Sequence, residues 1–484
     1  MRLPAAGAIR GTGYAAAIAC AAAALGVAVA WGLDRYGLRV VAALAAVAAA
    51  LLAVVAIRAR PAAGVVALAA VLAVFPVARV TVGGAPIYFT DVLIVVLLVV
   101  LAARRELRAI PPLGLIVLSV LAWIPALIYE ASAVDRYLEP AYGFGRELIA
   151  VSAFLIGAWV ASRPGVTRAV LLALAAGTIV TSVLAILQST GATYEQMKGF
   201  LEGVSPAFAP RGYVRYPDRA FAFFQAPTTL AGFLAVMGML LIGGFYAVRG
   251  RARIVITFAL AVVGPGLVAT YSRQWAPAVL AALVVVVLVV RPHRVGRIAL
   301  GLGLAALVAI GATAVGVLDA DRLTARFAGE QGADKNIQER LDLQQQFFEV
   351  TAEGGIESVV GRGSAGSDLV DRALIDSLAA QRLSVGISEN AILLEFFNHG
   401  IPAGILLLLL LALIIGRGIR TARVAGRDYP MSIGLVGALV AAVVLMGQDR
   451  YFTEAVFMKT LLWFLLGWLA ALSYAHSRAH RDPG

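Results

Sequence analysis

The stretch AILLEFFNHGIPAGILLLLLLALIIG (391–416) decides the fold class of this chain. Apart from Glu395 and His399 near its start, it carries no ionisable side chain. An α-helix needs about 20 predominantly apolar residues to cross a hydrocarbon core of about 30 Å. The stretch therefore predicts a membrane-spanning helix.

Similar apolar stretches recur along the chain. Of its 484 residues, 61% are hydrophobic and 14% charged, whereas a soluble domain is about half apolar and a quarter charged. This composition excludes a soluble nucleic-acid-binding protein, although the net charge is +12. We expect an all-α membrane protein with about 14 transmembrane helices. The predicted spans are residues 13–33, 40–57, 63–80, 88–103, 113–129, 148–162, 168–188, 229–247, 254–269, 276–290, 298–318, 391–416, 431–447 and 455–475.

Charge gives these spans an orientation. With the N-terminus inside, the alternate segments that face inward hold 21 Arg and three acidic residues, a net charge of +18. The rest of the chain holds 40 − 21 = 19 basic and 28 − 3 = 25 acidic residues, a net charge of −6. Cytoplasmic loops of membrane proteins carry the excess of Lys and Arg. We therefore expect a multi-pass protein of the bacterial inner membrane, with both termini cytoplasmic and its working surface outside.

The segments predicted to lie outside include three that exceed a simple connection. Two are medium loops, and the third, 319–390, has 72 residues and contains a predicted amphipathic helix over 335–350. The expected organisation is therefore a first helical region with two outer loops, a large extracytoplasmic helical loop, a second helical region and a tail. These parts are residues 1–318 with outer loops 130–147 and 189–228, then 319–390, 391–475 and 476–484.

Metal-binding side chains are scarce. The single cysteine, Cys20, falls in the first predicted span, so neither an intramolecular disulfide nor a cysteine-based metal site is expected. Of the four histidines, all but His399 fall in segments predicted to be cytoplasmic. We expect no metal site.

Arginines near the outer surface are the first candidate functional residues. Arg273 lies between two apolar segments with almost no loop around it, and either contacts lipid headgroups or acts on a substrate. A second group combines arginine with aromatic residues. It consists of Arg211, Tyr213, Arg215, Tyr216 and Arg219. Guanidinium groups match phosphate oxygens, which suits an anionic headgroup or sugar phosphate, while an interfacial aromatic belt is the alternative.

Two further candidates have simple structural alternatives. Arg340 lies in the predicted amphipathic helix of the long loop, where, taken alone, a solvated helix face is the favoured explanation. Arg146 ends an outer loop beside Glu147, and the two side chains could pair with each other.

The start of the 391–416 span carries the remaining candidates. Glu389 and Asn390 precede it, and a carboxylate at the membrane boundary can serve as a general base or as a salt-bridged acid at a helix N-terminus. Glu395 and His399 lie further in, and we interpret His399 as a polar packing residue.

These pieces, in this order and with this topology, resemble the O-antigen ligase and polymerase superfamily of bacterial membrane glycosyltransferases, which have the GT-C type of fold. The resemblance covers roughly residues 140–475. The matching features are a P-x-x-L-A-like helix start, an S-R step between helices, an Arg in the large loop, a G-x-G turn, and a polar pair that nine intervening residues separate from a Gly. In this chain they are PTTLAG (227–232), Ser272-Arg273, Arg340, Gly361 with Gly363, and Glu389-Asn390 with Gly400.

Two positions depart from the ligase pattern. Glu389 stands where the ligases have a functional histidine, and Ala403 stands where they have Gly, Thr or Tyr. Both departures favour a polymerase or another lineage of the superfamily.

The resemblance implies a metal-independent glycosyltransferase with no cofactor. Its donor would be a polyprenyl-diphosphate-linked glycan such as an undecaprenyl diphosphate oligosaccharide, and its acceptor a hydroxyl on another glycan or cell-envelope molecule. Arg273, Arg219 and Arg340 would stabilise the diphosphate leaving group. Glu389 would take the acceptor proton, and Asn390, Arg146, Arg211 and Arg215 with the two tyrosines would bind substrate.

Two other functions fit the composition. One is a flippase or transporter for a lipid-linked glycan, which would usually show two similar halves and charges near the bilayer centre. The other is a cell-wall polymerase of the shape–elongation–division–sporulation type, which shares the donor chemistry.

Overall fold

The fold was obtained as a computed structural model of the whole chain. The structure describes residues 57–82, 85–107, 112–133, 138–191, 219–224, 226–289, 355–361, 390–425, 430–449 and 455–479, with the single positions or pairs 195–196, 199, 342, 344–345, 349, 363 and 452. The predicted spans 13–33 and 298–318, nearly all of 40–57, and most of the predicted amphipathic helix 335–350 lie outside these residues.

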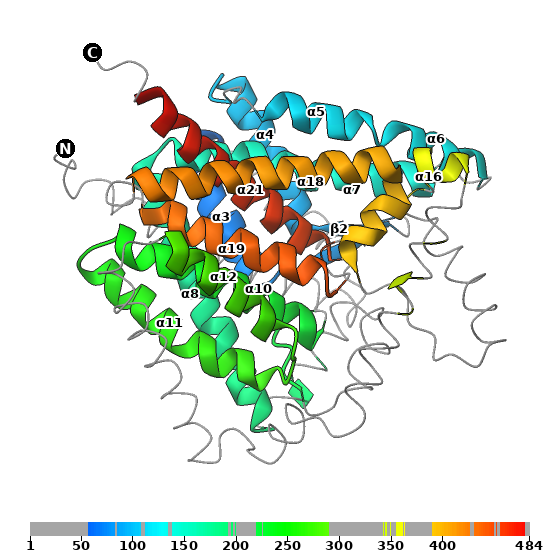
Figure 1. The fold of residues 1–484 in the computed structure, drawn as a ribbon. Helices are drawn as coiled ribbons and strands as arrows, with labels where there is room; N and C mark the ends of the chain where they lie inside the picture. The colour runs from blue at the N-terminus through cyan, green and yellow to red at the C-terminus, as the bar shows by residue number, and fades with distance from the viewer. Residues whose placement is uncertain are drawn as a thin grey trace, which may run out of the picture.

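Helices make up most of the described chain (Figure 1). They are α3 (Pro61–Val74), α4 (Phe89–Ala103), α5 (Leu113–Leu121), α6 (Ile124–Ala133), α7 (Leu138–Ala161), α8 (Pro164–Ser189), α10 (Pro227–Ala247), α11 (Arg251–Ala269), α12 (Trp275–Val289), α16 (Ile356–Val360), α18 (Ala391–Ala425), α19 (Pro430–Met446) and α21 (Val456–Ala479). Four of them, α3, α8, α10 and α19, begin with proline, which suits the first helical position because its missing N–H has no partner there.

The predicted membrane character is confirmed. Within the described residues, seven helical stretches are long and apolar enough to cross a membrane, and four shorter apolar helices accompany them. Each predicted span inside the described residues coincides with one of these stretches, although several predicted boundaries were wrong.

The largest boundary error concerns the outer loop predicted over 130–147. Helix α7 begins at Leu138, so most of this loop is helical. The span predicted over 113–129 is also divided, because the chain turns at Ala122-Trp123 between α5 and α6. Pro125 follows the turn by two residues and Pro140 lies in the first turn of α7, and proline is favoured near a helix N-terminus.

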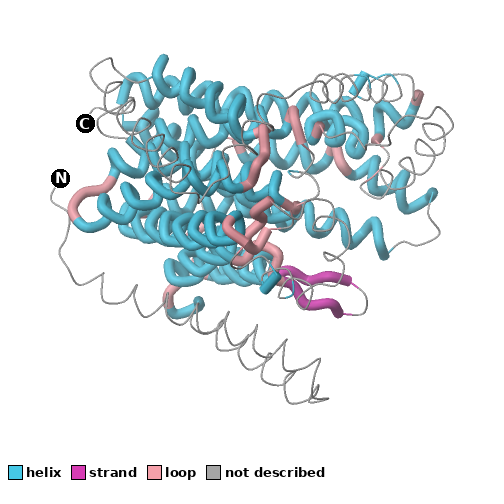
Figure 2. The backbone as a smooth tube through the Cα atoms, turned by 90° about the horizontal axis from the view of Figure 1, so that it is seen from below, coloured by secondary structure: helices cyan, strands magenta, loops and turns pink. Residues whose placement is uncertain are grey.

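A short hairpin replaces the end of the predicted 63–80 span. Strand β1 (Arg79–Val82) pairs antiparallel with β2 (Ala85–Tyr88), with Arg79 opposite Tyr88 and Val82 opposite Ala85. In the sequence a Gly-Gly dipeptide separates the strands, a composition typical of two-residue hairpin turns. Figure 2 shows the hairpin at the edge of the helical body.

Helix α18 is broken near its start. Gly400 has φ 84° and ψ 161°, outside the helical region, and Pro402 follows it. This backbone conformation favours glycine because it places a side chain in steric conflict. The break divides α18 into a short segment before Gly400 and a long apolar segment after it, as the bend in Figure 1 shows.

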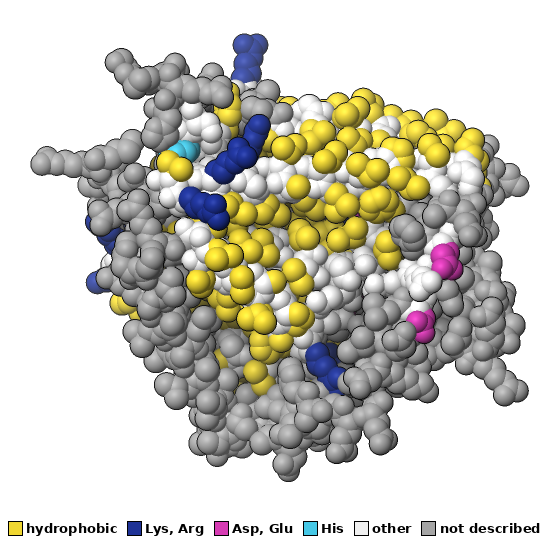
Figure 3. Space-filling model, in the orientation of Figure 1, with side chains coloured by type: hydrophobic (Ala, Val, Ile, Leu, Met, Phe, Trp, Pro, Cys, Tyr) yellow, Lys and Arg dark blue, Asp and Glu magenta, His cyan; other side chains and the backbone are white. Residues whose placement is uncertain are grey.

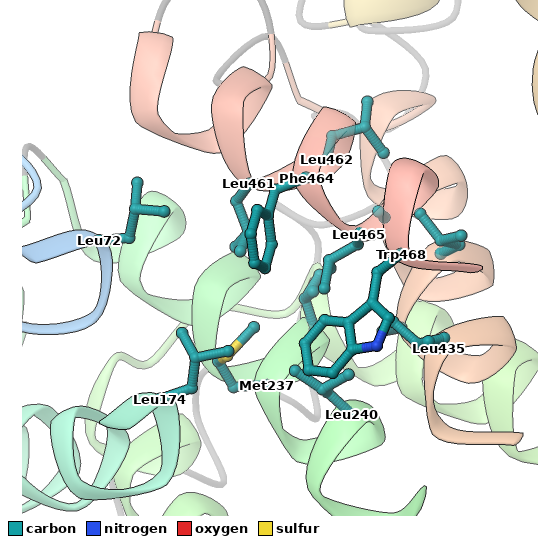
Figure 4. Packing of buried hydrophobic residues seen from close by; sticks show 14 of the residues in the cluster. Leu72, Leu174, Met237, Leu240, Leu435, Leu461, Leu462, Phe464, Leu465 and Trp468 are labelled. Atoms are coloured by element: carbon teal, nitrogen blue, oxygen red, sulfur yellow. The ribbon is translucent and has the colours of Figure 1, made fainter. Parts of the chain in front are cut away.

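The core surrounds α21, whose side chains are almost all buried. Leu461, Phe464 and Trp468 of this helix pack against apolar residues of other helices (Figure 4). A Cβ on Gly157 of α7 would strike Phe464, and one on Gly467 of α21 would strike Phe154. The glycines therefore allow the two helix backbones to approach closely, as small residues do in membrane helix pairs.

Charged side chains separate to two ends of the helical body. One end, here called the basic end, carries a set of arginines. They include Arg58, Arg104, Arg163, Arg249, Arg253 and Arg417. The Arg104 guanidinium donates to the Arg58 carbonyl over 2.6 Å, which ties helix ends far apart in sequence to this one end.

The opposite end of the helical body is here called the mixed-charge end. It carries acidic residues together with a few basic ones, among them Asp91, Glu147, Arg219, Arg273 and Lys459. In Figure 3 most of the basic side chains on the visible face lie at the left, the acidic ones lie at the right, and an apolar surface lies between them. The described residues thus reproduce the charge alternation that the sequence predicts.

Candidate functional site

Four ionisable side chains meet between helices α7, α18 and α21 at the mixed-charge end. Lys459 of α21 donates to Glu395 of α18 over 2.8 Å and to Glu147 of α7 over 3.2 Å. His399 of α18 has its Nε2 atom 2.9 Å from an oxygen of Glu147 and 3.5 Å from an oxygen of Glu395. Glu147, Glu395, His399 and Lys459 form what we call the buried cluster.

The buried cluster is shielded from solvent. The side chains of Glu395, His399 and Lys459 are 5–7% exposed, and that of Glu147 is 15% exposed. The ring of Trp123, at the turn between α5 and α6, stacks on the His399 ring with 4.8 Å between centroids, and Lys459 Nζ lies 5.6 Å from the same indole. Charged groups inside a membrane protein are expensive, and they mark functional sites by default.

A turn that follows α16 covers the backbone above His399. The Gly363 N–H donates to the Asn398 carbonyl over 2.8 Å, and Gly361 lies against the backbone of Asn398 to Gly400. Both turn glycines have φ above 80°, and a Cβ on Gly361 would enter the α18 backbone. The G-x-G sequence is therefore required here to let a segment of the predicted outer loop reach the break in α18.

A second constellation lies where α11 turns into α12, and it contains two of the predicted site residues. Arg219 is buried, and its Nε donates to the Thr270 carbonyl over 2.9 Å. The Ala220 N–H donates to the Ala269 carbonyl over 3.1 Å. These bonds fix Arg219 against the turn that carries Ser272 and Arg273. The sequence motifs that predicted Arg219 and Arg273 as functional residues thus come from segments that lie in contact.

The same turn is tightly held. Tyr271 has φ 48°, an uncommon conformation for a residue with a side chain, and the Ser272 N–H donates to the Thr270 hydroxyl over 3.2 Å. On the other side, the Gln188 side-chain carbonyl accepts from the Phe221 and Ala222 N–H groups over 3.0 and 2.6 Å. The segment that carries Arg219 is thus anchored to α8 as well as to the α11–α12 turn.

An aromatic contact connects this constellation to the buried cluster. The ring of Phe224, in the same segment as Arg219, meets Phe457 edge-on, with 5.4 Å between centroids. Phe457 lies two residues before Lys459 in the first turn of α21. The segment that carries Arg219 therefore contacts the same turn of α21 that supplies Lys459 to the buried cluster.

Arg146 occupies a separate position at the mixed-charge end. Its Nε lies 3.7 Å from an Asp91 oxygen, and its guanidinium stands over the rings of Tyr88 and Tyr142 at 4.5 and 5.6 Å. The pairing of Arg146 with Glu147 that the sequence left open was wrong, because Glu147 faces the buried cluster instead. This arrangement fixes Arg146 between the hairpin and α7.

Asn390 has a structural task. Its side-chain carbonyl accepts from the Ile392 and Leu393 N–H groups over 3.0 and 3.1 Å, so it caps the N-terminus of α18. The other predicted site residues fall outside the described part of the chain. They are Glu389, Arg340, Arg211, Arg215, Tyr213 and Tyr216.

Sequence reasoning missed Lys459 and underrated His399. A lysine within an apolar helix was a usable signal, especially in a chain whose only other lysines are Lys198 and Lys335. The pairing with Glu147 had no such signal, because the two residues are 312 positions apart. Among the described residues no group of acidic, histidine and cysteine side chains has the arrangement of a metal site.

Comparison with known proteins does not assign a function, so the proposal below is argued from the geometry of the site. No model of a protein family matches the chain, and no curated protein is significantly similar to it.

Proposed function

We propose that this protein is a membrane-embedded glycosyltransferase that moves a glycan from a polyprenyl diphosphate carrier to an acceptor hydroxyl, in assembly of a cell-envelope polysaccharide. The observation that supports it most directly is the contact between Arg219 and the turn that carries Ser272 and Arg273. Two arginines from segments 54 positions apart come to one place near the end of apolar helices. A fixed guanidinium in a poorly hydrated site suits a phosphate group.

The reaction needs negative charge to be stabilised at the leaving group. As the acceptor oxygen bonds to the anomeric carbon, the bond from that carbon to the diphosphate oxygen breaks, and the electron pair stays on the lipid diphosphate. Preorganised donors aimed at such charge lower the barrier without a metal ion. Arg219 and Arg273 take this role in the proposal, with Arg340 as a further contact from the large loop.

The acceptor hydroxyl must also lose its proton. The resemblance to the ligase and polymerase superfamily assigns this task to Glu389, at the start of α18. A carboxylate at the membrane boundary is a chemically adequate base. The acceptor is then a hydroxyl of a second lipid-linked glycan or of another envelope molecule.

The proposal includes a topology. The chain crosses a bacterial inner membrane about 14 times with both termini in the cytoplasm, and residues 319–390 form an outer loop above the site. Support comes from the separation of charge between the basic end and the mixed-charge end, since positive loops face the cytoplasm. The donor would therefore be used after it has been flipped to the outer face.

Transfer assays in proteoliposomes test this function. The donor would be lipid-linked oligosaccharides extracted from the host's own membranes. The variants are Arg219→Ala, Arg273→Ala and Glu389→Gln, and Arg253→Ala at the basic end is the matched control. Loss of one charge-stabilising donor typically costs a factor of about 100 to 1,000 in rate. We expect that loss for the two arginine variants, a normal rate for Arg253→Ala, and no effect of chelators. Normal rates in both arginine variants, or full dependence on a divalent metal, would contradict the proposal.

The buried cluster favours one alternative, an exporter of lipid-linked glycans. Charged residues between membrane helices are a common feature of transporters, and Glu395 and Lys459 are of this kind. Such a protein would bind the donor and carry it across vesicle membranes with the glycan still attached to its lipid. Release of free polyprenyl diphosphate during the reaction distinguishes the two functions.

A further inference from the structure

His399 lies in an environment that fixes which of its nitrogens carries a proton. Its Nε2 lies 2.9 Å from Glu147 and 3.5 Å from Glu395, and a carboxylate can accept a hydrogen bond but cannot donate one. A lone pair on Nε2 would therefore face two negative groups. The 2.9 Å contact is not aligned as a linear hydrogen bond, but its distance suffices to favour a proton on Nε2.

The other nitrogen is then the basic one. With the proton on Nε2, Nδ1 carries the lone pair of the neutral imidazole. Nδ1 is buried, and among the described residues it has no hydrogen-bond partner. A buried basic nitrogen without a partner is costly, which indicates a group kept available for a ligand.

Charged and aromatic groups surround the His399 ring. Glu147 and Glu395 approach its Nε2 atom, and Lys459 bonds to both carboxylates. Trp123 stacks on the ring, and the face of an indole attracts a cation, so positive charge that forms on the ring during a reaction would be stabilised there.

The position of His399 suits a substrate that arrives from the mixed-charge end. The turn after α16 lies on its backbone through Gly361 and Gly363, and buried Glu130 of α6 lies beside Gly363. The contact between Phe224 and Phe457 brings the segment that carries Arg219 against the first turn of α21, which also carries Lys459. A reacting sugar held between this segment and α18 would lie near both the arginine constellation and His399.

We propose that His399, rather than Glu389, is the base of the transfer reaction, and that Glu147 is the residue that positions it. The acceptor O–H bond breaks, its oxygen bonds to the anomeric carbon, and its proton moves to Nδ1 of His399, while the diphosphate leaves with its electron pair. Glu147 holds the Nε2 proton and stabilises the imidazolium that forms, and Lys459 keeps Glu147 in place. This inference rests on the proposed glycosyltransferase function.

The test compares His399→Gln with Glu389→Gln in the proteoliposome assay, with His476→Gln near the end of α21 as the matched control. General-base catalysis contributes a factor of about 100 to 10,000. We expect His399→Gln to lose that factor in kcat and to bind undecaprenyl diphosphate normally. Glu147→Gln should retain the base but lower kcat.

Each outcome decides a different claim. If Glu389→Gln loses the rate while His399→Gln keeps it, His399 is not the base, although the proposed function stands. If the unmodified protein transfers no glycan, the proposed function itself fails.

A spectroscopic readout covers the case in which His399→Gln does not fold. Replacement of His293, His476 and His480 by Gln leaves His399 as the only histidine, and ¹⁵N NMR then reports its tautomer. We expect a proton on Nε2 and a lone pair on Nδ1 when the ring is neutral. The opposite tautomer would overturn the proposal, whatever the transfer assay shows.

Discussion

The two ends of the helical body use the same residue types in opposite ways. At the basic end, Glu106 accepts from Arg163 over 2.8 Å and from the Trp159 indole N–H over 2.9 Å, and Arg104 lies 3.6 Å away. The side chains of Arg104, Glu106 and Arg163 are 22–40% exposed. Exposed pairs of this kind stabilise a protein by at most about 1 kcal/mol, so their value lies in orientation and helix anchoring.

The mixed-charge end buries its ionic groups instead. The two carboxylates, the lysine and the histidine of the buried cluster lie on three different helices and exclude most solvent. Burial of charge rarely raises stability over an apolar alternative of similar volume, because desolvation offsets the attraction. The number of ion pairs therefore does not identify a functional site in this protein. The burial of charged side chains, which costs free energy, is the better indicator.

The largest expected effect concerns the orientation of the two ends. In a Cys20→Ser chain, Ile356→Cys places a thiol at a residue that is 72% exposed at the mixed-charge end, and Arg251→Cys places one at the exposed start of α11 at the basic end. We expect a membrane-impermeant maleimide to label position 356 in intact cells, and position 251 after the membrane is opened. The reverse pattern would invert the topology and with it the side on which the donor is used.

The next effect is on stability. Lys459→Met leaves two buried carboxylates without their cation, which should cost about 3–5 kcal/mol of unfolding free energy. The triple variant that adds Glu147→Gln and Glu395→Gln removes those charges and should recover most of the loss. Denaturation of the purified protein in detergent measures both. A loss for Lys459→Met no larger than that for Arg163→Ala would remove the contrast between the two ends.

A smaller effect compares two glycines that both have positive φ. Gly250 at the basic end has φ 64° and open space around it, so Gly250→Ala should cost about 1–2 kcal/mol from backbone strain. Gly361 has φ 82° and lies against the α18 backbone, so Gly361→Ala adds a steric clash to the same strain. We expect the Gly361 variant to be less stable and more readily cleaved by protease near α16. Equal stability would mean that the turn does not hold the break in α18.

The smallest effect is at the basic end. Arg163→Ala should change the free energy of unfolding by less than about 1 kcal/mol, and that difference should shrink in high salt, because exposed ion pairs are screened. The difference caused by Lys459→Met should hardly respond to salt, since its partners are buried. Titration of both variants at low and high ionic strength provides the measurement, and equal salt sensitivity would contradict the burial argument.

The sequence predicted the fold class well because membrane burial imposes a simple rule. A run such as 391–416 has no soluble alternative, and every predicted span within the described residues coincides with an apolar helix or a closely spaced pair. Local interruptions were harder. Pro125 stands just after the start of α6 and Pro140 just after the start of α7, a local signal that the hydrophobic pattern alone does not use.

The site was predictable only in part. Arg219 and Arg273 stood out because they lie beside apolar helices on the predicted outer side, where a charged side chain near the membrane needs a reason. Glu147 could not be recognised as a cluster residue, since it is far from Lys459 in sequence and seemed paired with its neighbour Arg146. His399 looked like packing because nothing local identifies the carboxylate of another helix as its partner.

The close approach of α7 and α21 has a mechanical consequence. Gly157 and Gly467 allow the backbones of the two helices to touch, and we expect this contact to keep Glu147 and Lys459 at a constant distance from each other. Glu395 and His399 ride on a short segment that joins the rest of α18 at Gly400, where the helix ladder is interrupted. If the geometry around the histidine changes in the proposed reaction, we expect this segment to rotate about Gly400 while α7 and α21 stay in place.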